Sequence, residues 1–142
     1  MTAKLVQDFA AAFNRQDMEA LLGLFTDRAT YDDVFYGRYA GRAGLRELFA
    51  RMFREGRDYH WSMDVVVADE GRAAAEWTFD YTVTEAVPRS AGRKIRFGGM
   101  SLFELTGGKI RAYREYADSG VAFLQLGLPP EALAKVLARK LP

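Results

Sequence analysis

Three side chains of this 142-residue chain have the chemistry of acid–base catalysis: Asp33, Asp118 and Tyr31. A carboxyl group that faces an apolar cavity loses hydration, which raises its pKa and suits a general base working near neutral pH. A tyrosine hydroxyl can donate a hydrogen bond to a substrate carbonyl. Both aspartates also have a structural interpretation, because Asp33 can end a strand and Asp118 can cap a helix that begins near Ser119.

The neighbours of Asp33 limit which groups can act together. Asp32 precedes it directly, and consecutive side chains of a regular strand point to opposite faces of a sheet. Asp32 and Asp33 therefore cannot form a catalytic pair, and one of them alone can enter a pocket. Tyr31 stands in a Tyr-x-Asp string with Asp33, which gives it the strongest claim among the tyrosines to donate a hydrogen bond.

His60 is the one histidine, and its ordinary pKa lies near neutrality. Alternation along the strand predicted around it puts His60 on the same face as Ser62 and Asp64, opposite Trp61 and Met63. A histidine on the more polar face of a strand is usually a surface or interface residue. Contact with a ligand is the alternative interpretation.

Composition excludes several functional classes. Hydrophobic residues make up 49% of the chain and charged residues 27%, which is typical of one ordinary folded domain spanning residues 1–142. Lys and Arg (20) nearly cancel Asp and Glu (19), so the chain offers nucleic acid no broad electrostatic footprint. With no cysteine and a single histidine, we expect neither a disulfide nor a metal site.

We expect no membrane partner, because no stretch approaches the roughly 18–20 apolar residues of a membrane span. Residues 1–17 carry charge throughout and lack the apolar run of a signal peptide, which predicts a cytoplasmic protein. The glycine pairs at 98–99 and 107–108 do not stand between a strand and a helix, as phosphate-binding loops do. We therefore expect no cofactor.

The spacing of apolar residues predicts helices in the first part of the chain. Helical periodicity covers residues 5–13, after the possible N-cap Thr2, and residues 18–25, after the possible N-cap Asp17. A β-branched and aromatic segment at residues 29–36 predicts a short strand. A third helix is expected over about residues 45–54.

After Gly56 the apolar period changes from about 3.6 to about 2 residues. Alternation predicts long strands over residues 59–67, 75–83, 94–105 and 110–117, with a bulge or sharp bend at Gly98-Gly99. A short helical tail is expected over residues 121–126 and 131–140. Helices segregated against long strands predict an α+β fold, a cone-shaped curved antiparallel sheet wrapped by the N-terminal helices and enclosing a pocket.

Two strings carry a family resemblance that covers nearly the whole chain. Residues 13–31 (FNRQDMEALLGLFTDRATY) resemble the opening of SnoaL-like proteins in the nuclear-transport-factor-2-like superfamily. Residues 108–127 (GKIRAYREYADSGVAFLQLG) look like their closing strand and helix. The resemblance implies the cone-shaped fold and leaves the activity open, because this fold hosts isomerases, cyclases, epoxide hydrolases, dehydratases and non-catalytic modules.

Ketosteroid isomerases of this superfamily place a base where this chain has Asp33. They also need a tyrosine on the first helix and a protonated aspartic acid on a later strand. Here Phe9 occupies the tyrosine position, and no carboxylic acid stands near Met100-Ser101. The resemblance therefore does not extend to the isomerase chemistry.

Limonene-epoxide-type hydrolases resemble the chain differently. Tyr31-x-Asp33 keeps the tyrosine of their Tyr-x-Asn string, and Asp118 fits their closing carboxylate, but residues 76–78 lack their Arg-x-Asp pair.

SnoaL-type polyketide cyclases need less: an apolar pocket and one aspartate that serves as acid and base in an intramolecular aldol closure. The resemblance implies Asp118 for that role.

We therefore predict a cofactor-free SnoaL-like enzyme that performs acid–base chemistry, cyclisation or isomerisation, on a small hydrophobic carbonyl compound. The expected catalytic residues are Asp118, Asp33 and Tyr31, and the expected ligand contacts are Phe9, Trp77, Met100, Tyr116 and His60. The alternative is a non-catalytic module of the same fold that binds a hydrophobic ligand or dimerises. A homodimer is expected because the outer face of such a sheet is broad and rich in apolar residues.

Overall fold

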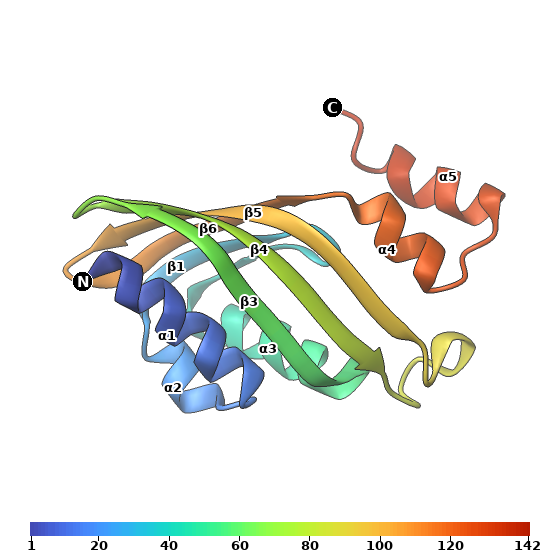
Figure 1. The fold of residues 1–142 in the computed structure, drawn as a ribbon, viewed down its shortest axis with the longest axis horizontal. Coiled ribbons are helices and arrows are strands. Elements are labelled where there is room, and N and C mark those ends of the chain that lie inside the picture. The colour runs from blue at the N-terminus through green and yellow to red at the C-terminus, as the bar shows by residue number, and fades with distance from the viewer.

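The computed structural model describes residues 1–142 and forms one curved sheet with helices on one side and at one end (Figure 1). The strands are β1 (Phe25–Asp33), β2 (Gly37–Ala40), β3 (Gly56–Ala68), β4 (Arg72–Val83), β5 (Lys94–Thr106) and β6 (Lys109–Ala117). The helices are α1 (Thr2–Asn14), α2 (Met18–Leu22), α3 (Gly41–Glu55), α4 (Ser119–Gln125) and α5 (Pro130–Ala138), with a short 3-10 turn at Pro88–Ser90. The predicted α+β fold with its curved sheet and helical tail is confirmed.

The six strands lie in the order β2-β1-β6-β5-β4-β3. Neighbours pair antiparallel with one exception, because β1 runs parallel to β6. The sheet is therefore mixed rather than wholly antiparallel. This parallel pair joins segments about 80 residues apart, and the local sequence pattern carries no sign of it. The short edge strand β2 was not among the predicted strands.

The helices α1, α2 and α3 cover the concave side of the sheet, and α4 and α5 lie at the end away from the N-terminus (Figure 1). In α1 the residues Val6, Phe9 and Phe13 recur at helical spacing and are fully buried. Asp17 caps α2 as predicted, since its Oδ1 accepts a hydrogen bond of 3.1 Å from the backbone N–H of Ala20. Thr2 is the first residue inside α1 and makes no cap, so that prediction is wrong.

Aromatic rings dominate the core between α1, α3 and the sheet. Phe13 and Trp61 lie 5.1 Å apart between ring centroids, and Trp61 lies 5.5 Å from Trp77 and 4.9 Å from Phe79, all edge to face. Such pairs fix ring orientation beyond what burial of area alone would do. The rings of β3 and β4 therefore form a rigid wall on the concave side.

The glycines of β5 serve packing rather than a bulge. Thr78 pairs with Gly98 and Trp77 pairs with Gly99 in an uninterrupted β4–β5 ladder, so of the two predicted alternatives, a bulge or a sharp bend, the bulge is wrong. A Cβ atom at Gly99 would lie 2.6 Å from the Trp77 ring and 2.7 Å from the carbonyl oxygen of Tyr116. The missing side chain lets the indole pack directly on the backbone of β5.

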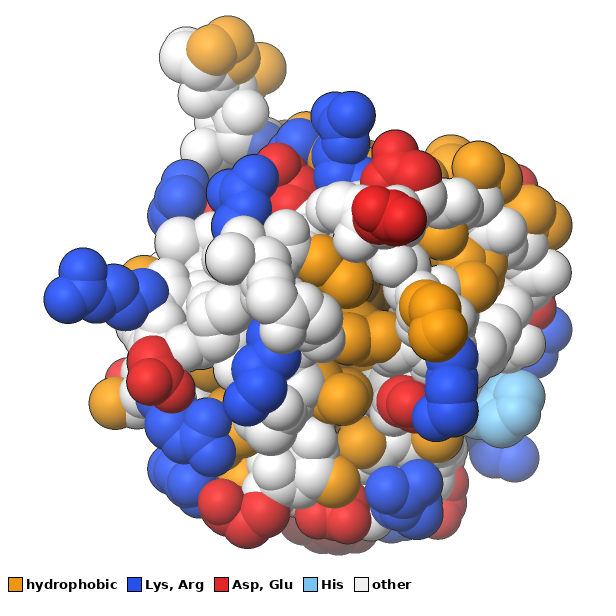
Figure 2. All heavy atoms as spheres, turned by 90° about the vertical axis from the view of Figure 1, so that its left-hand side faces the viewer, with side chains coloured by type: hydrophobic (Ala, Val, Ile, Leu, Met, Phe, Trp, Pro, Cys, Tyr) orange, Lys and Arg blue, Asp and Glu red, His pale blue; other side chains and the backbone are white.

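The surface carries charges of both signs. Figure 2 shows one end of the molecule, where Lys and Arg side chains alternate with Asp and Glu around an area of hydrophobic side chains. This distribution agrees with the nearly balanced composition. No helix has the combination of length and apolar character that crossing a membrane requires.

Candidate active site

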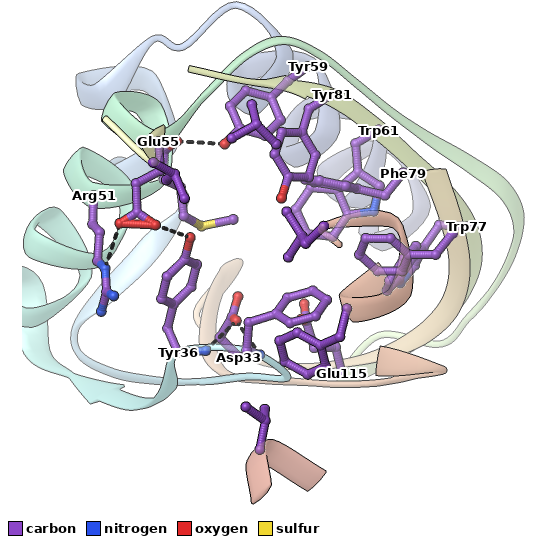
Figure 3. A pocket seen from close by; sticks show the side chains of 18 of the residues that line it. Asp33, Tyr36, Arg51, Glu55, Tyr59, Trp61, Trp77, Phe79, Tyr81 and Glu115 are labelled. Carbon is purple, nitrogen blue, oxygen red and sulfur yellow. Dashed lines mark hydrogen bonds and ion pairs between the residues drawn. The ribbon is translucent and has the colours of Figure 1, made fainter. Parts of the chain in front are cut away.

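A cavity of about 320 Å³ lies between the concave face of the sheet, the end of α3 and the C-terminal tail (Figure 3). Fourteen of its 19 lining residues are hydrophobic. The apolar wall comes mainly from the aromatic side chains Phe35, Trp61, Trp77, Phe79, Phe97 and Phe123. Val136 and Arg139, in and just after α5, line it from the tail. The cavity is of a size and character to enclose a small apolar molecule.

Two carboxyl groups meet in this cavity because β1 pairs with β6. In the parallel ladder Tyr31 lies beside Tyr113, and alternation puts Asp33 and Glu115, two residues further along each strand, on the same face. Both carboxyl groups line the cavity and point into it (Figure 3). Two groups that are far apart in sequence thus form one acidic pair.

Asp33 is buried, and its carboxyl group is held by backbone hydrogen bonds from the turn that follows it. Its Oδ1 accepts hydrogen bonds from the backbone N–H groups of Phe35, at 2.8 Å, and Tyr36, at 2.9 Å. Burial raises the pKa of Asp33, and the two N–H groups oppose that rise only in part. Its Oδ2 has no hydrogen-bond partner within the protein, which leaves this oxygen available to a ligand.

Glu115 is the second carboxyl group of the pair. Its Oε1 accepts a hydrogen bond of 2.6 Å from the Tyr113 hydroxyl, and its Oε2 accepts one of 3.0 Å from the backbone N–H of Val34. Burial and the nearby charge of Asp33 nevertheless raise the pKa of Glu115 to about 8. The Asp33–Glu115 pair therefore retains a proton at neutral pH and can both give and take one.

A third carboxyl group in the cavity, that of Glu55, is paired with neighbouring side chains. Glu55, the last residue of α3, accepts hydrogen bonds of 2.9 Å from the Tyr36 hydroxyl and from Nε of Arg51. The Arg51 guanidinium also lies over the Tyr36 ring, 4.5 Å from its centroid. The negative charge of Glu55 is therefore paired, and this cluster fixes the end of α3 against the loop after β1.

The tyrosines on the cavity wall differ in what their hydroxyl groups do. Tyr36 donates to Glu55, and Tyr59 donates to the backbone oxygen of Met52 at 2.5 Å. The Tyr81 hydroxyl has no partner within the protein and points into the cavity toward the acidic pair (Figure 3). Burial, with the charges of Glu55 and Asp33, raises the pKa of Tyr81 to about 12, so this hydroxyl stays protonated and can donate to a ligand.

Two of the residues predicted for the site lie behind the cavity wall. The Tyr31 ring stacks on Tyr113 with 4.1 Å between centroids, and its hydroxyl is buried without a hydrogen-bond partner. Phe9 is fully buried against Phe103 and Tyr113 in the core under α1. Neither residue lines the cavity.

Asp118 lies on the opposite side of the sheet from Asp33. Its Oδ1 accepts a hydrogen bond of 3.3 Å from the backbone N–H of Val121, so it caps α4, the structural alternative considered above. It borders a shallow groove on the outer face together with Met100 and Tyr116. The two aspartates singled out from the sequence therefore do not share a cavity.

The remaining two predicted contacts divide between the faces. Trp77 forms part of the cavity wall and also borders the outer groove. His60 lies on the outer face with its side chain 70% exposed, and its Nδ1 is 3.9 Å from a carboxylate oxygen of Asp80. Neither the cavity nor the outer groove includes His60.

Reasoning from the sequence missed Glu115 and gave Tyr81 no particular weight. A signal for Glu115 was present, since Tyr113-x-Glu115 repeats the Tyr31-x-Asp33 arrangement of an aromatic ring followed by an acid on the same face. What the sequence lacked was the parallel pairing that sets the two strings side by side. No group of three or more His, Cys, Asp or Glu side chains is arranged to hold a metal ion.

The family model of the SnoaL-like domain matches residues 6–113, more than half of the chain. The chain belongs to the SnoaL-like family. Its fold is that of the nuclear-transport-factor-2-like superfamily, as the strands, the helices and the structural neighbours agree. No curated protein matches this SnoaL-like chain significantly.

Solved structures similar to this SnoaL-like protein include candidate polyketide cyclases. One from Xanthomonas campestris pv. campestris is 25% identical, with a TM-score of 0.79 over 88% of this chain and 96% of that chain. Another, from Pseudomonas putida KT2440, is 29% identical, with a TM-score of 0.70 over 79% and 87%. An epoxide hydrolase of M. tuberculosis similar to limonene epoxide hydrolase is 20% identical, with a TM-score of 0.72 over 96% and 95%, which shows the shared fold.

Proposed function

We propose that this SnoaL-like protein catalyses cofactor-free acid–base chemistry on a small apolar carbonyl compound bound in the cavity. The observation that carries the proposal is the Asp33–Glu115 pair, two carboxyl groups with raised pKa values that face one aromatic-lined cavity. Buried carboxyl groups tuned toward neutrality are what proton transfer at carbon requires. The likeness to two candidate polyketide cyclases supports the same reaction class.

The geometry suggests a role for each group. Asp33, through its unpartnered Oδ2, removes a proton from the carbon next to the substrate carbonyl. The electron pair of the broken C–H bond moves to the carbonyl oxygen, which accepts a hydrogen bond from the Tyr81 hydroxyl. Glu115, which holds a proton at neutral pH, returns one to the new carbanion position or to the oxygen of a second carbonyl after ring closure. Proton and charge are balanced over the cycle once Asp33 passes its proton back to Glu115.

The proposal is tested without knowing the natural substrate. Hydrogen–deuterium exchange at the carbon next to the carbonyl is followed by NMR in D₂O for a panel of small aromatic ketones. The protein is expected to accelerate the exchange of ketones that fit the cavity, and Asp33→Asn is expected to reduce it by about 100-fold or more. Asp32→Asn is the matched control, because Asp32 lies next to Asp33 but points to the outer face.

The alternative function, binding without turnover, gives a different result in the same assay. Ketones would then bind saturably, as measured by quenching of the buried Trp61 and Trp77, but exchange would equal that in buffer. A protein that neither binds nor exchanges any of these ketones would contradict both forms of the proposal.

We also propose that the protein forms a homodimer through the outer face of the sheet. Val65, Glu76, Met100 and Tyr116 are cross-strand neighbours in one row, and three of them are exposed apolar side chains. Val67 adds a side chain that is 69% exposed. A second copy would bury this row by two-fold pairing. Sedimentation equilibrium is expected to give a dimer for the native chain and a monomer for Tyr116→Glu, and a monomeric native chain would contradict the proposal.

A further inference from the structure

A chain of buried hydrogen bonds runs across three strands and ends on Glu115. Trp77 on β4 donates from Nε1 to the Ser101 hydroxyl on β5 at 2.7 Å. The hydroxyl groups of Ser101 and Tyr113 lie 2.7 Å apart, and Tyr113 on β6 lies 2.6 Å from Oε1 of Glu115. Ser101 is 2% exposed and Tyr113 is 1% exposed, so bulk water does not compete for these groups.

The two ends of this hydrogen-bond chain together fix the direction of its bonds while Glu115 is ionised. An indole N–H can donate but cannot accept, so the Ser101 oxygen must accept from Trp77. At the other end, the Glu115 carboxylate can only accept, so the single hydroxyl hydrogen of Tyr113 goes to Oε1. The hydrogen between Ser101 and Tyr113 must then come from Ser101. All three bonds point toward the carboxyl group.

We infer that Trp77, Ser101 and Tyr113 are positioning residues that present a fixed donor to Oε1 of Glu115 and thereby direct its exchangeable proton to Oε2. This inference rests on the proposed function in treating Glu115 as the acid of the pair. Oε1 accepts from Tyr113, whereas Oε2 accepts only from the backbone N–H of Val34 and keeps a lone pair for a proton. Oε2 bonds to the N–H of Val34, the residue directly after Asp33, so a proton on Oε2 would lie beside the strand end that carries Asp33 and could be exchanged within the pair.

The hydrogen-bond chain also lowers the pKa of Glu115, against the effects that keep this group protonated. Burial and the charge of Asp33 raise the pKa of Glu115, while the Tyr113 hydroxyl, the Val34 N–H and the positive charge of Lys140 on the tail lower it. Without Tyr113 as a donor, the carboxylate form would lose its shortest hydrogen bond. The pKa would then rise further from about 8, and Glu115 would release its proton less readily.

The stacked tyrosine pair supplies a matched control. Tyr31 and Tyr113 are both nearly inaccessible to solvent and lie face to face. The Tyr113 hydroxyl has two partners, whereas the Tyr31 hydroxyl has none. Tyr113→Phe and Tyr31→Phe therefore delete the same atom from the same environment, and only the first deletion cuts the chain.

The test is a carbon-13 NMR titration of the Glu115 carboxyl carbon in the free protein, with its resonance assigned by its absence in Glu115→Gln. Tyr113→Phe is expected to raise the pKa of Glu115 by about one unit or more, roughly a tenfold gain in proton affinity. Tyr31→Phe is expected to leave it unchanged. An unchanged pKa in Tyr113→Phe, or an equal rise in both variants, would overturn the inference.

Variants of Ser101 test the upstream part of the chain and decide the matter if Tyr113→Phe does not fold. Ser101→Ala removes the acceptor of Trp77, so the indole N–H proton resonance is expected to move upfield and the pKa of Glu115 to rise less than in Tyr113→Phe. Ser101→Thr keeps a hydroxyl and is expected to restore both values. If Ser101→Ala moves neither value, the chain does not act on Glu115.

This titration needs neither substrate nor turnover, so it tests the inference separately from the proposed function. A Glu115 pKa that follows the variants, in a protein that exchanges no ketone protons, would retain the positioning chain and reject the catalytic role. Ketone exchange that depends on Asp33 but is insensitive to Tyr113 and Ser101 would support the catalytic role and reject the positioning chain.

Discussion

The acidic pair should make the folded protein less stable as the pH rises, and Glu115→Gln isolates that effect. An ordinary glutamate has a pKa of 4.5, whereas Glu115 in the fold has a pKa of about 8. The folded state therefore binds this proton more tightly than the unfolded chain does. Stability from the protonated group is present in full below about pH 4.5 and is lost progressively as the pH rises through 8.

The size of this stability loss follows from the difference between the pKa of Glu115 in the unfolded chain and in the fold. Each unit between the two pKa values corresponds to about 1.4 kcal/mol, so the full interval corresponds to about 5 kcal/mol of unfolding free energy. That figure is an upper value, because Asp33 and Glu115 share a proton, and part of the titration falls on Asp33. Even half of it is a large share of the roughly 5–15 kcal/mol that stabilises a typical domain.

Urea denaturation followed by tryptophan fluorescence measures this free energy, since Trp61 and Trp77 are buried in the fold. Between pH 5 and pH 8 the native protein is expected to lose stability more steeply than Glu115→Gln, which carries no titrating group at this position. Glu47→Gln is the control, because Glu47 is exposed and makes no ion pair, and its slope is expected to equal the native one. Equal slopes for the native protein and Glu115→Gln would refute a raised pKa at Glu115.

Five further substitutions, at four positions, test the packing around the site by the same denaturation assay. Tyr31→Phe is expected to be neutral or slightly stabilising, because its buried hydroxyl has no partner, whereas Tyr113→Phe is expected to cost about 1–3 kcal/mol by breaking two hydrogen bonds. Asp118→Ala is expected to cost about 1 kcal/mol through loss of the α4 cap, and Asp118→Asn, which can still cap, close to nothing. Gly99→Ala is expected to cost about 1–3 kcal/mol and to change the near-ultraviolet circular dichroism of Trp77, because the new Cβ would overlap its ring.

Patterns that depend on near neighbours in the chain were predicted well from the sequence. Alternation separated Asp33, which is buried, from Asp32, which lies on the outer face, and the cap at Asp17 was identified from its position before an apolar helix face. The four long strands follow from the two-residue period after Gly56. These features are local, because each is fixed by side chains within one turn or one strand.

The acidic pair could not be predicted in the same way, because it depends on the pairing of β1 with β6, two strands that are far apart in the sequence. Nothing near Glu115 in sequence indicates that β6 lies beside β1 and runs parallel to it. Asp118 illustrates the opposite problem. It stands one residue beyond the end of β6, where the strand gives way to α4, and a helix cap there competes directly with a place in the pocket.

The cavity contains two acidic clusters, and their difference supports a catalytic role for one of them. Glu55 is paired with Arg51 and Tyr36, which offset its charge in the ordinary manner of a structural ion pair. Asp33 and Glu115 form no ion pair, and four hydrogen bonds to their oxygens do not restore the pKa of either to its usual range. Apolar side chains at these two positions would complete the aromatic lining and remove the energetic penalty of two buried acids. Two carboxyl groups that share one apolar cavity without a salt bridge are an energetic cost to the fold, and that cost is what supports the proposed role in proton transfer.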